Sequence, residues 1–97
     1  MRVRFTPSAE REFLDALSFI RHESPAASDA LLVRSEDGLA QLGDFPESGR
    51  IVPEFPDLPY REVIVNPYRF FYNVVGDTVW IVAMWHERQV PDSRSRS

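Results

Sequence analysis

The sequence predicts an α+β domain in which an antiparallel hairpin of two helices packs on an antiparallel sheet. Residues 2–5 alternate polar and apolar side chains, as a half-buried strand does. Between residues 9 and 42, apolar residues recur at steps of three and four, which places them on one helical face. Residues 60–88 then hold three strand-like runs separated by turn signals. The N-terminal strand must join the sheet that these three C-terminal strands complete, because a lone strand is not stable.

Two helices are predicted from their start signals. Thr6 is a good N-cap and Pro7 suits the first helical position, and Ser24 and Pro25 repeat this arrangement for a second helix. Gly38 is expected to weaken the second helix, so that it frays or ends early. The short link predicts an antiparallel hairpin. The predicted apolar positions are Ala9, Phe13, Ala16, Leu17 and Ile20 in the first helix, and Ala27, Ala30, Leu31, Leu39 and Leu42 in the second.

Residues 43–59 are expected to form a loop with extended pieces, because four prolines and two glycines interrupt an otherwise partly apolar segment. The three strands follow, and the breaks fall at Asn66-Pro67 and Gly76-Asp77. The last strand is apolar on both faces, which predicts an internal place in the sheet. Strict alternation predicts one face with Phe70, Tyr72 and Val74 and the other with Arg69, Phe71 and Asn73. In the last strand, strict alternation predicts one face with Val79, Ile81, Ala83 and Trp85 and the other with Trp80, Val82, Met84 and His86.

The length and composition indicate one globular domain, residues 1–90, followed by a short disordered tail, residues 91–97. The chain has 97 residues and no cysteine, which excludes disulfides and fits a reducing cytoplasm. All 11 basic residues are arginine, against 15 acidic residues, and the net charge of −4 argues against a general nucleic-acid binder. No apolar run has the length of a membrane span and no signal-peptide pattern opens the chain, so we expect a cytoplasmic protein.

No metal or cofactor is expected. Two histidines without a cysteine make a poor ligand set for a transition metal, and the sequence has no glycine-rich loop of the kind that cradles phosphate.

The arginines of the C-terminal strands are the candidate functional residues. If the protein were a ribonuclease, Arg61 and Arg69 would clamp the phosphate, His86 would act as acid or base, and Glu54 or Glu62 would serve as base. The strand phasing predicts that Arg61 and Arg69 reach one concave face. The structural alternatives are an ion pair between Arg69 and Glu62 across the strands, and a packing role for His86 at its strand end. Arg50 is expected to hold the preceding loop through backbone carbonyls, and Trp80 and Trp85 to pack in the core or on the sheet.

The chain resembles the RelE/ParE toxins of bacterial type II toxin–antitoxin systems over nearly its whole length. The resemblance rests on the order and spacing of VRFTPSAEREFLDAL at 3–17, SPAA at 24–27, FPESGR at 45–50, YRE at 60–62, PYRFFY at 67–72 and WHER at 85–88. It implies a small cytoplasmic toxin that a separate antitoxin neutralises by wrapping it with a helix and an extended tail. It also places a functional arginine of the nuclease members at Arg69.

The family divides by target, and the resemblance is more ParE-like than RelE-like. ParE-like members inhibit DNA gyrase, whereas RelE-like members cleave messenger RNA at the ribosome and are strongly basic, unlike this chain. The resemblance therefore implies a gyrase inhibitor with a ParD-like antitoxin, and no DNA contact except through that antitoxin. A RelE-like endoribonuclease and a non-toxic partner-binding module remain the alternatives. The candidate target- or antitoxin-binding residues are Arg61, Arg69, His86 and Arg88; a ribonuclease would add Glu54.

Overall fold

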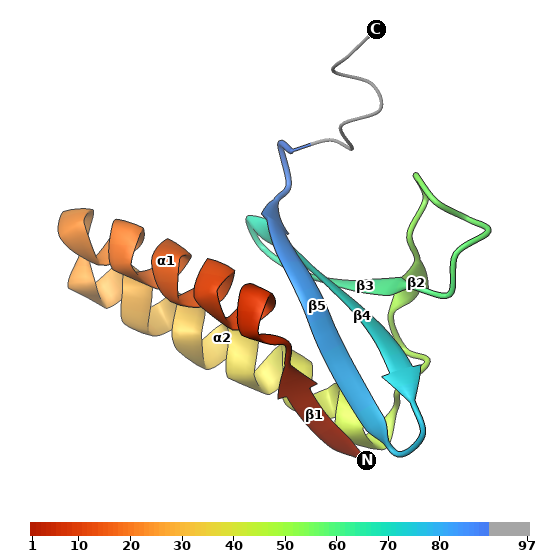
Figure 1. Ribbon diagram of the computed structural model, residues 1–97. Coiled ribbons are helices and arrows are strands. Elements are labelled where there is room, and N and C mark those ends of the chain that lie inside the picture. The colour runs from red at the N-terminus through yellow and green to blue at the C-terminus, as the bar shows by residue number, and fades with distance from the viewer. Residues whose placement is uncertain (90–97) are drawn as a thin grey trace, which may run out of the picture.

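Two layers make up the fold, with a pair of helices on one side and a five-stranded sheet on the other (Figure 1). The computed structural model describes residues 1–89. The predicted disordered tail, residues 91–97, lies outside these described residues. The elements in chain order are β1 (Arg2–Phe5), α1 (Pro7–Glu23), α2 (Pro25–Asp44), β2 (Arg50–Ile51), β3 (Arg61–Val65), β4 (Tyr68–Val75) and β5 (Thr78–His86). The predicted fold class and element order are confirmed.

Both helices begin where the sequence predicts. The Thr6 side chain accepts a hydrogen bond from the backbone N–H of Ala9 at 3.3 Å, and Ser24 accepts one from Ala27 at 3.1 Å. Ser24 also ends α1, because its own N–H donates to the carbonyl of Ile20 at 2.8 Å. A single residue therefore serves as the C-cap of one helix and the N-cap of the next, and this close link produces the antiparallel hairpin.

The expectation that α2 frays or ends at Gly38 is wrong, since the helix continues to Asp44. Leu39 and Leu42 lie beyond Gly38 and are buried in the core, and their burial outweighs the roughly 1 kcal/mol that glycine costs in a helix. A Cβ atom at Gly38 would lie 3.4 Å from a methyl group of Val65. This is an ordinary van der Waals distance, so α2 packs against β3 at Gly38 with room for a methyl group.

The predicted apolar face of α1 is confirmed, whereas that of α2 is partly wrong. Ala9 and Phe13 are buried, and the other three predicted α1 positions pack against the core. In α2, Ala27 and Ala30 are exposed, and Ser28 and Ser35 lie on the buried face instead. Small hydroxyl residues were not expected there. Ser28 is accommodated because its hydroxyl donates to the carbonyl of Leu17 across the hairpin at 3.0 Å.

The sheet has the strand order β1-β5-β4-β3-β2. The pairs β5–β4 and β4–β3 are antiparallel, as predicted, and the short strand β2, in the segment expected to be a loop, also pairs antiparallel with β3. β1 runs parallel to β5, so the sheet is mixed. β5 is internal, as its two apolar faces indicated. Where β1 ends, the N–H of Thr6 bonds to the carbonyl of Ile81 at 2.9 Å, and α1 then turns away from the sheet. Beyond Ile81, β5 has no β1 residue beside it.

An irregularity between β4 and β5 changes which residues of β5 face the helices. Phe71 pairs with Ala83, but the next residue, Tyr72, pairs with Ile81, so Val82 is extra. Strict alternation along β5 was therefore wrong beyond Ile81. Met84 joins Val79 and Ile81 in the core, while Ala83 and Trp85 line a pocket with Phe71 on the other face. A bulge shifts the side-chain phase by one residue, and periodicity alone does not reveal it.

The core lies between the helices and the sheet. Phe5, Phe13 and Phe70 form an aromatic cluster there, with ring centroids 5.5 to 6.5 Å apart. At the β4–β5 turn, Gly76 has a φ of +61°, which suits the first central position of a two-residue hairpin. Neither helix in residues 1–89 combines the length and apolar character that crossing a membrane requires.

Candidate functional site

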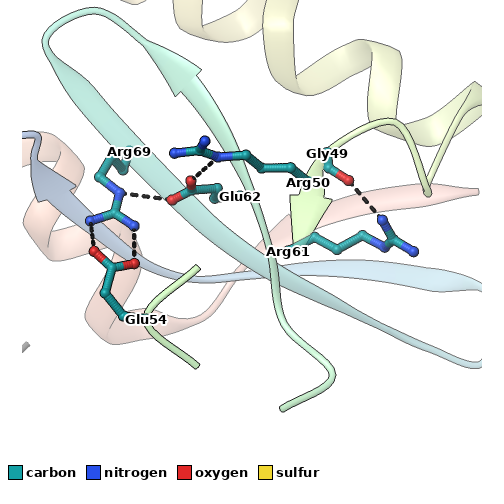
Figure 2. Close-up of polar contacts among 6 residues, drawn as sticks. All are labelled: Gly49, Arg50, Glu54, Arg61, Glu62 and Arg69. Atoms are coloured by element: carbon teal, nitrogen blue, oxygen red, sulfur yellow. Dashed lines mark hydrogen bonds and ion pairs between the residues drawn. The ribbon is translucent and has the colours of Figure 1, made fainter. Parts of the chain in front are cut away.

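Four charged side chains, one each from β2, the loop after it, β3 and β4, form a chain of ion pairs on the sheet face away from the helices (Figure 2). The Nε of Arg69 donates to Glu62 at 2.7 Å, and its two terminal nitrogens donate to the carboxylate of Glu54 at 2.9 and 2.7 Å. The other carboxylate oxygen of Glu62 accepts from the Nε of Arg50. Two arginines and two glutamates balance each other, so the network carries no net charge.

The network is buried at its centre and more exposed at its ends. The Glu62 side chain is 0% exposed and that of Arg69 is 8% exposed, whereas Glu54 is 29% and Arg50 is 64% exposed. The hydrogen bonds from Arg69 lower the pKa of Glu54 below its ordinary value of 4.5, and those from Glu54 raise the pKa of Arg69. Removing one member would leave a buried charge without its partner, so the network is a structural unit of the fold.

Arg69 and Glu62 form the ion pair across neighbouring strands that was the structural alternative to a catalytic role. Glu62 lies opposite Phe71 in the β3–β4 register, and Arg69 lies two residues from that position on the same face. The guanidinium of Arg69 also lies 4.9 Å from the ring centroid of Phe71. Arg69, one of the two hypothetical phosphate-clamping arginines, is therefore neutralised by Glu54 and Glu62, the two hypothetical bases.

The prediction that Arg61 and Arg69 share one concave face is wrong. Arg61 pairs with Tyr72, a core residue, and points to the other side of the sheet from Arg69 (Figure 2). Its guanidinium donates to the carbonyl of Gly49 at 2.8 Å and to that of Glu47 at 3.4 Å. The expected role of Arg50, holding the loop through carbonyls, thus belongs to Arg61. Arg50 itself pairs with the carboxylate of Glu62.

Tyr72 and Gly49 close the loop that leads into β2. The Tyr72 hydroxyl donates to the carbonyl of Pro46 at 2.8 Å and accepts from the N–H of Gly49 at 2.9 Å. Burial raises the pKa of Tyr72. A Cβ atom at Gly49 would lie only 2.6 Å from the carbonyl oxygen of Glu62, so only glycine lets the chain approach β3 this closely.

His86 and Arg88 lie at the end of β5, apart from the ion-pair network in the fold. The ring of His86 packs edge-on against Tyr68, with the centroids 5.4 Å apart, on the side of the sheet that faces α1. Its Nδ1 accepts from the backbone N–H of Arg88 at 3.1 Å. Arg88 is exposed. These contacts match the packing role that was the alternative for His86. In residues 1–89, the five candidates for a ribonuclease site do not converge on one catalytic centre; they are Arg61, Arg69, His86, Arg88 and Glu54.

An apolar pocket lies beside the network and was not predicted. It has a volume of about 190 Å³, and its lining residues are Val52, Phe55, Leu58, Tyr60, Phe71, Val82, Ala83 and Trp85. Residues 52–60 supply one wall, and the ion pair between Glu54 and Arg69 fixes this segment to β4. The expected packing role of Trp85 is met by its edge-on contact with Phe71 at 5.0 Å. The recurrent apolar residues of the proline-rich segment were the only sequence signal for this pocket.

A metal centre has no support in the described part of the chain, where no group of three histidine, aspartate or glutamate side chains is arranged to hold an ion.

The fold is the one that the resemblance to RelE/ParE toxins implies. The chain matches, over residues 3–91, the family model described as the ParE toxin of type II toxin–antitoxin system, parDE, and it belongs to that family. A solved structure titled "Chromosomal ParDE TA system from P. aeruginosa" has a similar fold, with a TM-score of 0.66. It is 15% identical in sequence, and the match covers 89% of this chain and 95% of that chain. A comparison with curated proteins gave no match.

Proposed function

We propose that this ParE-family protein inhibits DNA gyrase by binding to it, and that a cognate ParD-like antitoxin neutralises it. The family match supports a toxin and an antitoxin partner. Gyrase as the target is an inference from the ParE-like character of the sequence. Because gyrase acts on chromosomal DNA, the proposal also places the protein in the cytoplasm.

One observation carries the choice of a binding inhibitor over a ribonuclease. The guanidinium of Arg69 donates one hydrogen bond from each of its three nitrogens to Glu62 and Glu54, and the side chain is only 8% exposed, so its two remaining N–H groups are hardly accessible. A phosphate clamp needs free donors, and a general base needs a carboxylate that is not already bound to a cation. Opening the network would separate buried opposite charges, which costs on the order of 3–5 kcal/mol.

The target-facing surface is proposed at the end of β5 and the adjoining apolar pocket. Arg88 is exposed there, and Trp85 and Phe55 line the pocket. Aromatic residues and arginine are the side chains that most often anchor protein–protein interfaces. The volume of about 190 Å³ suits a side chain of a protein partner more than a cofactor, because cofactor pockets are usually larger, roughly 300–1,000 Å³.

Purified protein tests the proposal directly. It should block supercoiling by gyrase in a dose-dependent manner and should leave messenger RNA intact, both alone and with ribosomes. Cleavage of messenger RNA would establish the RelE-like alternative instead. If expression neither arrests growth nor inhibits either target, the chain is a non-toxic binding module.

Two variants test the surface. Arg88→Ala should weaken gyrase inhibition while leaving the thermal midpoint unchanged, because its exposed side chain contributes little to the fold. Arg21→Ala is the matched control, since Arg21 is also an exposed arginine but lies on α1, in a surface ion pair with Asp29 at 3.7 Å. Equal inhibition by the two variants would remove Arg88 from the target surface.

A further inference from the structure

The strands of the sheet carry five arginines, and three of them are bound within the fold. Arg50 and Arg69 pair with carboxylates in the ion-pair network, and Arg61 donates to backbone carbonyls. The other two, Arg2 and Arg4 of β1, form no ion pair within residues 1–89. Both side chains are exposed, so their charges are available to a partner.

Both of these arginines point away from the helices. Val3 and Phe5, which alternate with them along β1, pack against the core, and successive side chains of a strand point to opposite faces. Arg2 and Arg4 therefore lie on the same face of the sheet as the ion-pair network, but at the edge that β1 forms (Figure 1). Two residues along a strand span about 7 Å, so the two guanidinium groups extend from neighbouring points of one surface.

Trp80 continues this surface from β1 toward the middle of the sheet. In the strand register Arg4 lies beside Trp80, and Trp80 lies beside Asn73 of β4. The two neighbours of Trp80 in β5 are fully buried in the core, so the indole lies on the outer face, where it is only partly buried. Val82 follows two residues later and lines the apolar pocket. The arginines, the indole and the pocket thus form one continuous surface, whose β1–β5 strip consists of Arg2, Arg4, Asn73 and Trp80.

No carboxylate of the described residues balances the two arginines of the β1–β5 strip. Glu62 is the only acidic residue in the five strands, and it is fully buried and paired with two other arginines. Asp77, in the turn beside β1, accepts a hydrogen bond from the Thr78 hydroxyl at 3.1 Å and forms no ion pair with Arg2. The strip is therefore locally cationic in a chain of net charge −4.

We propose that the β1–β5 strip extends the target-facing surface and binds an acidic segment of the target protein. Trp80 would pack against an apolar group of that segment, and Arg2 and Arg4 would each pair with a carboxylate. An extended peptide presents alternate side chains about 7 Å apart, which is also the spacing of the two arginines, so carboxylates two residues apart would fit both. The inference rests on the proposed function, because it takes gyrase as the target.

A protein segment fits the strip better than a nucleic acid does. Two arginines neutralise about two phosphates, whereas a protein that depends on phosphate contacts commonly makes about 6–10 of them. The net charge of −4 also repels a polyphosphate. Arginine and tryptophan are the side chains most enriched among those that dominate protein–protein binding, and one carboxylate for each arginine satisfies the strip.

Arg4→Glu is the decisive variant. Reversing the charge beside Trp80 should weaken binding to purified gyrase holoenzyme about tenfold at low salt, and the loss should shrink to about twofold at high salt. Arg4→Lys keeps the charge and should stay within about threefold of the wild type. Arg11→Glu is the matched control, since it makes the same change at an exposed arginine of α1, and its affinity should stay within about twofold.

Trp80→Thr gives a second readout with a different signature. Threonine suits a partly exposed strand position, and loss of the indole should weaken binding about tenfold or more at both low and high salt. Circular dichroism and thermal melts of each free variant must show a native fold before its affinity is compared. The Arg4 variants decide the question by themselves if Trp80→Thr does not fold.

The outcomes separate the inference from the proposed function. If gyrase binds the wild type and Arg4→Glu equally at low salt, the inference is refuted and the toxin proposal stands. If the wild type neither binds nor inhibits gyrase, both proposals fall. Saturable binding of a single-stranded oligonucleotide that Arg4→Glu abolishes would assign the strip to nucleic acid. Loss of binding to the product of the adjacent gene, with unchanged gyrase binding, would assign it to the antitoxin, and either result overturns the inference.

Discussion

Replacing Arg69 by alanine is the sharpest test of the buried network. The change removes three charge-assisted hydrogen bonds and leaves Glu62, whose side chain is 0% exposed, with Arg50 as its only cation. Breaking a buried pair by removing one partner costs about 3–5 kcal/mol. The low end of this range is expected because Glu62 keeps its hydrogen bond from Arg50. The loss of the Glu54 pair adds little to the cost, because Glu54 is partly exposed and can be hydrated. We therefore expect a loss of about 3 kcal/mol in the free energy of unfolding.

This loss is large for a chain of 97 residues, whose total stability should be about 5–10 kcal/mol. The thermal midpoint should fall by about 12–24 °C. Urea unfolding followed by circular dichroism and tryptophan fluorescence measures the free energy directly, and the m-value should not change. Arg88→Ala is the control, since it removes an exposed arginine and should alter stability by less than about 0.5 kcal/mol.

A second substitution isolates the buried charge as the cause. In the Arg69→Ala background, Glu62→Gln should restore part of the lost stability because it removes the uncompensated negative charge, whereas in the wild type the same change should destabilise. A loss below about 1 kcal/mol for Arg69→Ala would refute the reasoning, since it would mean that the network is hydrated or open in solution.

Three further predictions concern single groups. Ser35→Ala should raise stability by up to about 1 kcal/mol in thermal melts, because the Ser35 hydroxyl is buried without a partner among residues 1–89 and alanine is the better helix former. Tyr72→Phe should lower stability by about 1–3 kcal/mol in urea unfolding, because it leaves Gly49 and Pro46 without their hydrogen bonds, and an unchanged midpoint would contradict that role. The stability that the lowered pKa of Glu54 contributes is present above its ordinary value of 4.5 and is lost as the pH falls through the lower folded value. Thermal midpoints measured above and below pH 4.5 should therefore fall less steeply with acidification for Glu54→Gln than for the wild type. Parallel plots of midpoint against pH for the two proteins would count against the ion pair.

The fold was largely predictable because its signals are local. Thr6-Pro7 and Ser24-Pro25 each place a cap and a preset backbone angle at a helix start, and these need no information from distant residues. The features that the sequence predicted wrongly or missed depend on packing between distant segments. The continuation of α2 past Gly38, the burial of Ser28 and Ser35, and the parallel pairing of β1 with β5 follow from contacts between segments far apart in the chain.

The candidate site was predictable in its residues but not in its arrangement. The sequence pointed to Arg61, Arg69 and His86, and the pairing of Arg69 with Glu62 was one of two roles it left open. It did not indicate that Glu54 would occupy the other side of the same guanidinium, because residues 52–60 have no periodicity that fixes where they lie. Nor did it place Arg61 and Arg69 on opposite faces, although neighbouring strands in register imply it once the register is known.

By itself the sequence determined the order of the elements, the helix boundaries at Thr6 and Ser24, the apolar face of the first helix and the family resemblance. These depend on backbone preferences and on apolar spacing, which act within a few residues. Only the tertiary structure decided the function of the charges. Whether an arginine is a free donor or a buried counterion depends on which carboxylates the fold brings within about 3 Å, and that is set by strand register and the path of a loop.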